Sequence, residues 1–246
     1  MTSTGKGYRF GLALSLMLLS GFQAIAQQDQ DTTPKTNWTI NPRLHTSGYF
    51  PFTGALLNRN WVADVNVFME KKAWGFFLFQ SVDLEDRHSY VNYMQPGIFA
   101  TLRPSQNLRL RAFFGYILSQ TNSFCDPESD YYTAVQVNWN VTPSLRIENT
   151  LLFYDYSLSK KLANRFLVEW ASGAFRISGY LWQRTVLDEN SNSTSGSLAV
   201  TYAFRLSEKA SVELTGSFIG YLTQSIPDFA LRKGAFLTVA VPLTFH

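Results

Sequence analysis

The chain has 246 residues and a formal net charge of +3, with 15% aromatic and only 16% charged residues. An ordinary soluble domain carries about a quarter charged residues, so much of this protein's surface need not face water. No basic tail or polybasic run points to nucleic acid, and the single cysteine, Cys125, cannot form an internal disulfide.

Residues 1–26 are predicted to be a cleaved secretory signal peptide. Two basic residues precede an apolar core that ends at Leu19, and Ala24 and Ala26 supply the small residues of a cleavage site. The apolar core is shorter than the roughly 20 residues of a membrane-spanning helix, which disfavours an N-terminal anchor. The mature chain is then residues 27–246, in which no apolar run is long enough for such a helix.

The mature chain alternates apolar and polar residues with a period of two. Leu110, Ala112 and Phe114 share one face of a segment whose other face holds Arg109 and Arg111. A period of two predicts a β-strand. About twelve such segments are expected, at 38–46, 60–69, 74–84, 90–102, 107–119, 131–141, 145–156, 163–171, 174–186, 195–206, 211–223 and 233–245. Most have the length that a tilted strand needs to cross a bilayer.

The links between these segments alternate in length. Short links lie at 70–73, 104–107, 142–144, 172–173 and 207–209, and longer ones separate them. The longer links include "SGYFPFTGALLNRN" after the first segment and "DENSNST" before the tenth. Membrane barrels alternate short periplasmic turns with longer external loops, so an even number of strands predicts that both termini are periplasmic.

A soluble β-sandwich would also alternate, but its polar face would be rich in Lys and Glu. Here the polar face holds mainly Asn, Ser, Thr, Gly and Tyr with some Arg, as a hydrated interior would. Aromatic residues lie near segment ends, where interfacial girdles belong: Trp38, Trp61, Trp74, Tyr90, Tyr131, Trp139, Tyr156 and Phe245. We therefore predict an all-β fold, a single closed antiparallel up-and-down transmembrane β-barrel of about 12 strands.

Over essentially all of residues 27–246 the chain resembles the outer-membrane β-barrel class of Gram-negative bacteria. The resemblance implies contact with outer-membrane lipid and a final strand that the barrel-assembly machinery recognises by its terminal aromatic residue. Phe245 matches that pattern one position early, because His246 follows it. At about twelve strands, the architecture is similar to that of monomeric channels selective for acidic oligosaccharides.

The charged residues predicted to face the barrel interior are candidates for function. The eleven candidates are Arg43, Arg109, Arg111, Arg146, Glu148, Arg165, Glu169, Arg176, Arg184, Arg205 and Glu213, and Asp64 and Asp83 are also expected to face inward. Unpaired arginines in a narrow pore would favour anions, because guanidinium is always charged. Alternatively, Arg146, Glu148, Glu169 and Arg176 pair with one another and simply satisfy a filled interior.

Inward aromatic residues could fill the interior or line a track for sugars; they are Phe77, Phe79, Phe99, Phe113, Tyr154, Tyr180 and Trp182. The leading hypothesis is a narrow passive channel for small anionic or sugar-like solutes, with no cofactor.

Two other functions are considered. His45 and Ser47 share a strand face, and this spacing resembles that of outer-membrane phospholipases, acyl hydrolases that use a histidine-activated serine. In those enzymes the site faces lipid, whereas here alternation turns both residues inward. A non-conducting anchor or accessory barrel of a surface complex is the other alternative. The three histidines are scattered along the sequence, so no metal site is expected.

Overall fold

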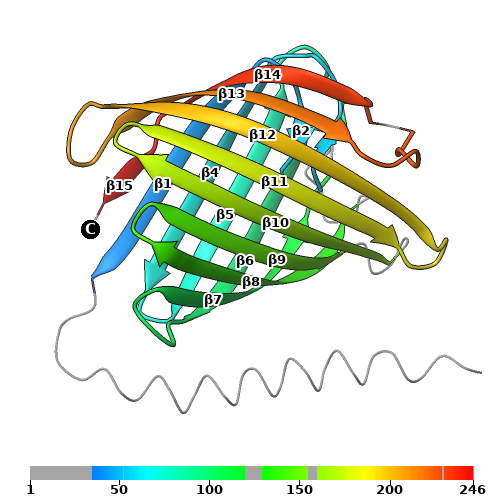
Figure 1. The fold of residues 1–246 in the computed structure, drawn as a ribbon. Helices are drawn as coiled ribbons and strands as arrows, with labels where there is room; N and C mark the ends of the chain where they lie inside the picture. The colour runs from blue at the N-terminus through cyan, green and yellow to red at the C-terminus, as the bar shows by residue number, and fades with distance from the viewer. Residues whose placement is uncertain (1–34, 52, 120–128, 155–159, 229, 246) are drawn as a thin grey trace, which may run out of the picture. The chain divides into compact units, whose positions relative to one another are not determined.

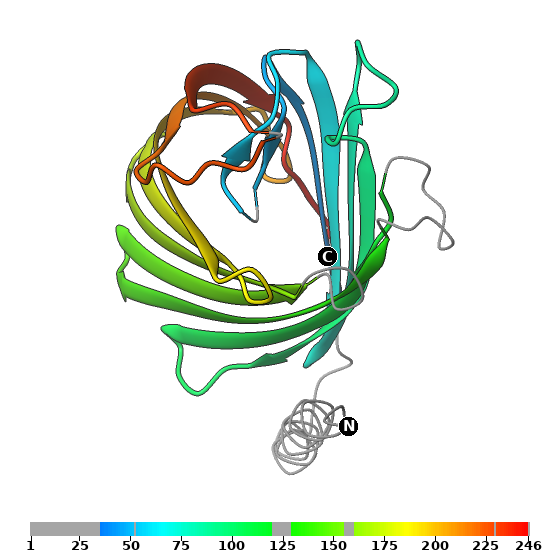
Figure 2. The same cartoon turned by 90° about the vertical axis from the view of Figure 1, so that its right-hand side faces the viewer.

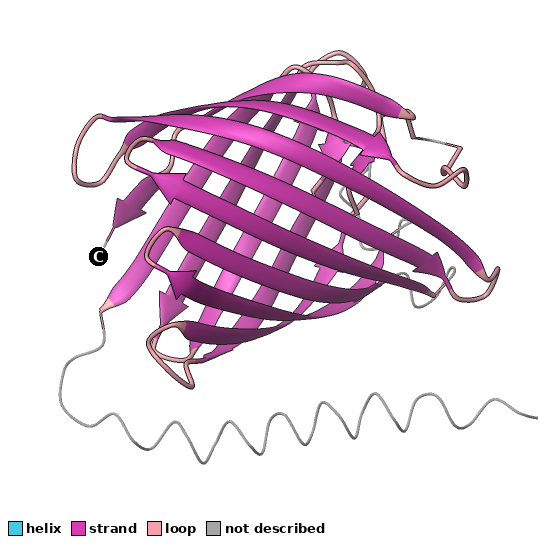
Figure 3. Ribbon diagram, in the orientation of Figure 1, coloured by secondary structure: helices cyan, strands magenta, loops and turns pink. Residues whose placement is uncertain are grey.

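The structure is a computed structural model that describes residues 35–51, 53–119, 129–154, 160–228 and 230–245. The regular elements in these ranges are β-strands (Figures 1 and 3). In this part of the chain no helix is long and apolar enough to cross a membrane. The signal peptide lies outside the described residues and stays a prediction. Cys125 and His246 also lie outside the described residues.

Twelve antiparallel strands form a closed barrel, which confirms the predicted fold (Figure 2). Their bounds are β1 Thr36–His45, β4 Val62–Lys71, β5 Trp74–Asp83, β6 Tyr93–Leu102, β7 Leu108–Ile117, β8 Asp130–Thr142, β9 Leu145–Tyr154, β10 Lys161–Ser172, β11 Phe175–Val186, β12 Ser191–Arg205, β13 Ser211–Tyr221 and β14 Lys233–Ala240, which β15 Leu243–Phe245 continues in the same register. Pro242 has no amide hydrogen and lies between β14 and β15. Strand β1 pairs with β4 on one side and with β14 and β15 on the other, so the barrel has no open edge.

Strand β1 starts at the same end of the barrel at which β15 finishes. Trp38 pairs with Phe245, which closes the barrel at the end that holds the short turns. We call this the short-turn end and the opposite one the long-loop end. Gly173 shows why the turns at the short-turn end can be tight: it adopts a φ of 57° in the link between β10 and β11, a conformation that glycine tolerates best.

Large apolar side chains cover the outside of the barrel. Those exposed near mid-strand include Ile98, Phe114, Val135, Val137, Leu151, Phe166, Leu181, Leu198, Val200, Leu214, Phe218, Leu237 and Val239. Exposed aromatic residues lie toward the strand ends: Trp38, Trp61, Trp74, Tyr90, Tyr131, Trp139, Trp170, Phe175, Phe204 and Phe245. An exposed apolar band between two aromatic girdles is the surface of a barrel that crosses a bilayer. Tyr156, which we also expected in a girdle, lies outside the described residues.

Inside the barrel, aromatic rings lie against inward-facing glycines. A Cβ atom on Gly75 would lie 2.1 Å from the Phe99 ring, and one on Gly97 would lie 2.5 Å from the Phe77 ring. Each ring therefore packs directly against the backbone of the neighbouring strand, where only a glycine leaves room for it.

The packing over Gly97 gives a testable prediction. We expect Gly97→Val to destabilise the barrel by about 1–3 kcal/mol, because the new side chain would overlap Phe77 and the Phe114 carbonyl oxygen. Gly179→Val is the matched control, since nothing lies within 4 Å of a Cβ at Gly179. Urea unfolding in lipid vesicles measures both, and equal effects of the two substitutions would contradict this account of the wall.

The link between β1 and β4 differs most from expectation. We expected "SGYFPFTGALLNRN" to be an external loop, but part of it forms a hairpin of β2 (Tyr49–Phe50) and β3 (Ala55–Leu56) that folds into the barrel (Figure 2). Ala55 and Leu56 are buried, and Leu56 packs against the inward residues Trp182 and Phe236. Burial of these apolar side chains explains why the segment leaves the solvent.

The hairpin between β11 and β12 also differs from expectation. Residues 188–194 were predicted to be a loop, yet β12 already begins at Ser191. The turn closes within Leu187–Asn190, where Asn190 adopts a φ of 50°. The first residues of β12 are mostly serine, threonine and asparagine, so they lack the apolar alternation on which the strand prediction depended.

Candidate functional site

The barrel encloses a cavity of about 510 Å³. Inward side chains of every barrel strand except β6 line it, together with Tyr49 and Pro51 of the inward hairpin. This volume lies within the range of sites that hold one small organic molecule.

Nine of the eleven candidate residues line this cavity: Arg43, Arg109, Arg111, Arg146, Glu148, Arg165, Glu169, Arg176 and Glu213. The other two do not. Arg184 donates a hydrogen bond to the Tyr154 hydroxyl at 3.2 Å, toward the long-loop end. Arg205 is exposed at the end of β12 and donates to the Ser207 carbonyl oxygen.

Four of the lining residues form a chain of ion pairs along β9, β10, β11 and β13. Arg146 lies 3.3 Å from Glu169, and Glu169 lies 3.4 Å from Arg176. Arg176 also donates to Glu213 at 2.8 Å. Glu169 is thus shared by two guanidinium groups, and its removal would leave Arg146 without a carboxylate partner among the described residues.

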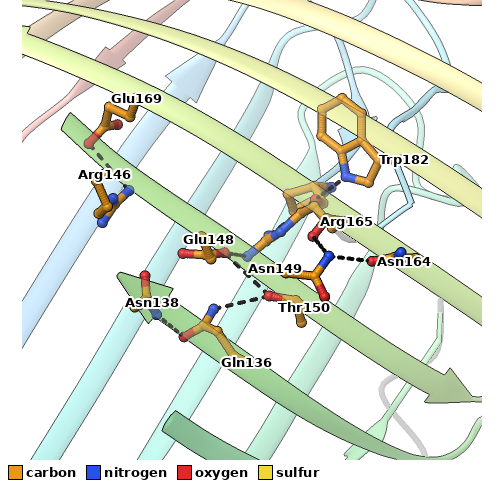
Figure 4. A network of polar contacts seen from close by, with 11 residues as sticks. Gln136, Asn138, Arg146, Glu148, Asn149, Thr150, Asn164, Arg165, Glu169 and Trp182 are labelled. Atoms are coloured by element: carbon orange, nitrogen blue, oxygen red, sulfur yellow. Dashed lines mark hydrogen bonds and ion pairs between the residues drawn. The ribbon is translucent and has the colours of Figure 1, made fainter. Parts of the chain in front are cut away.

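A second polar network connects the wall to the inward hairpin (Figure 4). Arg165 forms an ion pair with Glu148, which also accepts a hydrogen bond from the Thr150 hydroxyl. The carbonyl oxygen of Pro51 accepts hydrogen bonds from Trp182 Nε1 at 3.1 Å and from Arg165 at 3.4 Å. This network fixes the tip of the hairpin against β10 and β11.

His45 belongs to a third network, at the seam where the barrel closes. Arg43 binds Asp64 through two hydrogen bonds of 2.6 and 3.1 Å. His45 Nε2 lies 2.8 Å from Asp64, and its Nδ1 lies 2.7 Å from the Thr238 hydroxyl. Both ring nitrogens of His45 are therefore occupied, and neither is left to activate Ser47. This arrangement does not favour the hydrolase hypothesis.

Arg109 differs from the other five arginines that line the cavity. Arg111 forms an ion pair with Glu70 at 2.6 Å, and Glu70 also binds Arg103. Arg109 lies on the same inward face of β7 as Arg111, yet it forms no ion pair with any described carboxylate. Among the described residues that line the cavity, Arg109 is the arginine whose charge no carboxylate offsets within ion-pair distance.

The interior wall of β4 to β8 is aromatic. Phe77 lies 5.6 Å from Phe113 in an edge-to-face arrangement and 5.8 Å from Phe68, as measured between ring centroids. Phe99 contacts both Phe68 and Phe113 and is fully buried beneath them. Phe68, Phe77 and Phe113 line the cavity, so one side of the lumen is apolar.

Several contributors to the site were missed from the sequence, among them Phe68 of the aromatic wall. Glu70 shares the inward face of β4 with Asp64 and could have been found by the same alternation. Tyr49 and Pro51 enter the cavity only because the hairpin folds inward, and the one signal for that was an unusually apolar loop. Among the described residues, no group of three or more His, Cys, Asp and Glu side chains could hold a metal ion.

A closed barrel with an apolar exterior and a charged, partly open lumen defines a porin-like outer-membrane protein, consistent with a Gram-negative outer membrane. Comparison with solved structures supports this class. The KdgM porin matches with a TM-score of 0.58 and 10% identity, over 85% of this chain and 99% of that chain. The NanC porin matches with a TM-score of 0.54 and 9% identity, over 86% and 100% respectively.

One further match is the KdgM porin in complex with disordered oligogalacturonate, with a TM-score of 0.56 and 9% identity over 85% of this chain and 99% of that chain. No protein-family model and no curated protein sequence matches the chain. At these identities the comparisons establish the fold, which is that of outer-membrane porins.

Proposed function

We propose that the barrel is a narrow passive channel of the outer membrane for small solutes that are anionic or sugar-like. The observation that carries this proposal is the charge of the lumen. Six arginines line the cavity; five of them form ion pairs with carboxylates, and Arg109 has no ion-pair partner among the described residues. A guanidinium without a carboxylate partner attracts anions at any physiological pH.

The ion pairs bear on the alternative that the charged residues merely satisfy a filled interior. Arg43, Arg146 and Arg165 are paired, and such pairs attract ions weakly because their charges largely cancel. The excess of positive charge is therefore concentrated near Arg109. The porin fold and the oligogalacturonate complex of KdgM, whose named ligand is a sugar carboxylate, also support a channel for such solutes.

The charge of Arg109 provides the test. We expect Arg109→Gln to lower the anion-over-cation permeability ratio of the channel in planar bilayers. A unit charge about 4 Å from a permeating ion is worth about 1 kcal/mol at the dielectric constant of water, roughly a fivefold change in anion occupancy. Reversal potentials in a salt gradient measure the ratio.

Two further variants sharpen this experiment. Glu169→Gln should raise the anion preference, because it leaves Arg146 unpaired and removes one of the two partners of Arg176. Arg205→Gln is the control for net charge, since Arg205 is exposed and does not line the cavity. Its charge is screened by salt within about 10 Å at 0.1 M. A bilayer that stays silent would favour the non-conducting anchor, and equal selectivity in all variants would refute anion selection by the lumen.

We also propose that the barrel-assembly machinery recognises the last strand through Phe245. Phe245 is exposed, pairs with Trp38 and ends β15. Its position at the short-turn end is consistent with a periplasmic C-terminus, where that machinery would meet the unfolded chain.

A further inference from the structure

Resting on the proposed channel function, we propose that the lumen favours carboxylates whose ring is apolar over carboxylates whose ring is hydroxylated. The inference comes from the unequal chemistry of the two walls. In the ring of twelve strands, β5 and β11 are six strands apart and therefore face each other across the lumen. Phenylalanine rings of β4, β5 and β7 line one side of the cavity, and ion pairs between β9, β10 and β11 line the other side together with Tyr180 and Trp182.

The phenylalanine rings of the aromatic wall offer an apolar surface without hydrogen-bonding groups, next to polar lining residues such as Asn66 and Tyr132. Phe68, Phe77 and Phe113 reach the cavity from three different strands, and the Phe77 ring contacts both of the others. The Phe77 ring packs against Gly97 of the next strand, where no Cβ atom displaces it. An apolar ring that displaces water from this surface gains free energy, whereas a hydroxylated ring leaves its hydroxyl groups without partners there.

Arg109 places a guanidinium beside this wall. Arg109 and Phe113 point inward from the same strand, four residues apart, which is about 13 Å along the backbone. The long side chain of Arg109 spans part of that distance. A carboxylate bound to Arg109 can therefore keep its ring within the aromatic wall.

The opposite wall completes the selection. The guanidinium groups of Arg146 and Arg176 are engaged with Glu169 and Glu213, so they present both donors and acceptors to the lumen. A solute in the cavity therefore meets ion-paired hydrogen-bonding groups on this side, opposite the phenylalanine rings. The two walls together therefore complement a solute that has one polar edge and one apolar face.

Block of the chloride current tests the preference. The probes are cyclohexanecarboxylate and glucuronate, two six-membered ring carboxylates that differ mainly in the hydroxyl groups. With the purified full chain in planar bilayers, we expect cyclohexanecarboxylate to halve the current at a roughly fivefold lower concentration than glucuronate, as burial of one apolar ring face would give.

Substitutions in the wall localise the effect. Phe113→Ser should remove the preference while leaving the chloride-over-sodium selectivity intact, because Arg109 is unchanged. Phe68→Ser is a second wall variant in case Phe113→Ser folds poorly. Phe114→Ser is the matched control: Phe114 is the next residue along β7 but is exposed on the outside of the barrel, so the preference should persist.

The outcomes separate this inference from the function on which it rests. Absence of any current would refute the channel itself. An anion-selective current that glucuronate blocks as well as or better than cyclohexanecarboxylate would overturn the inference and leave the channel standing. A preference that survives both wall variants would also overturn it.

Discussion

Phe218→Arg is expected to lower the free energy of unfolding of the barrel in lipid vesicles by about 2–4 kcal/mol, the cost of a cationic side chain on the lipid face near the bilayer midplane. Phe218 lies in the middle part of β13 and is 53% exposed on the outside of the barrel. Its neighbour Ser217 points the other way and lines the cavity. The two positions therefore lie on the same strand at nearly the same depth in the bilayer, but Phe218 faces lipid and Ser217 faces the lumen.

Ser217→Arg is the matched control. Its guanidinium enters a hydrated lumen, so stability should change little and the anion preference should rise. Phe218→Ala separates the loss of the aromatic ring from the cost of the charge. Urea titrations into vesicles measure all three, and a larger loss for Ser217→Arg than for Phe218→Arg would mean that the barrel is turned inside out relative to our assignment.

The positions and faces of the strands could be predicted because two strong constraints coincide. The side-chain period of a strand is two, and the bilayer fixes a strand length of about 9–11 residues. Together they place Arg109 and Phe113 inward and Phe114 outward without knowledge of any neighbour. Closure follows as well, since an unpaired edge in lipid would be costly, and Trp38 does pair with Phe245.

The partners inside the lumen were harder to predict, because they depend on the stagger of the strands. Arg146 and Glu169 are direct partners in the register of β9 and β10, so their ion pair follows once that register is known. Glu148 instead faces Leu167 in the register and binds Arg165, its diagonal neighbour. Diagonal contacts require the tilt and twist of the sheet, which no local pattern contains.

The inward hairpin escaped prediction for a different reason. Periodicity distinguishes strands from loops, but it does not tell whether a loop turns outward or inward. The apolar content of residues 49–57 was the available signal, since Leu56 and Leu57 have no reason to face water. What fixes the hairpin is tertiary: Asn58 donates to Asp83 at 2.6 Å and to Ser89 at 2.9 Å, contacts between segments far apart in sequence.

Removal of this hairpin is expected to raise the single-channel conductance severalfold. Tyr49 and Pro51 line the cavity, so the hairpin narrows the lumen toward the long-loop end. The backbone amide of Leu57 donates to the Gly48 carbonyl oxygen at 2.8 Å, so two glycines in place of residues 49–56 would complete a β-turn without moving the strands. The barrel strands and their hydrogen bonds remain intact in this variant.

Trp182→Phe is the graded comparison for the hairpin deletion. It removes the hydrogen bond from Trp182 Nε1 to the Pro51 carbonyl oxygen but keeps a ring beneath the hairpin. We expect the mean conductance to change little and the current to fluctuate more, because the tip of the hairpin is held less firmly. If the deletion left the conductance unchanged, ions would have to pass the barrel by a path that the hairpin does not border, and the constriction would lie elsewhere among the lining residues.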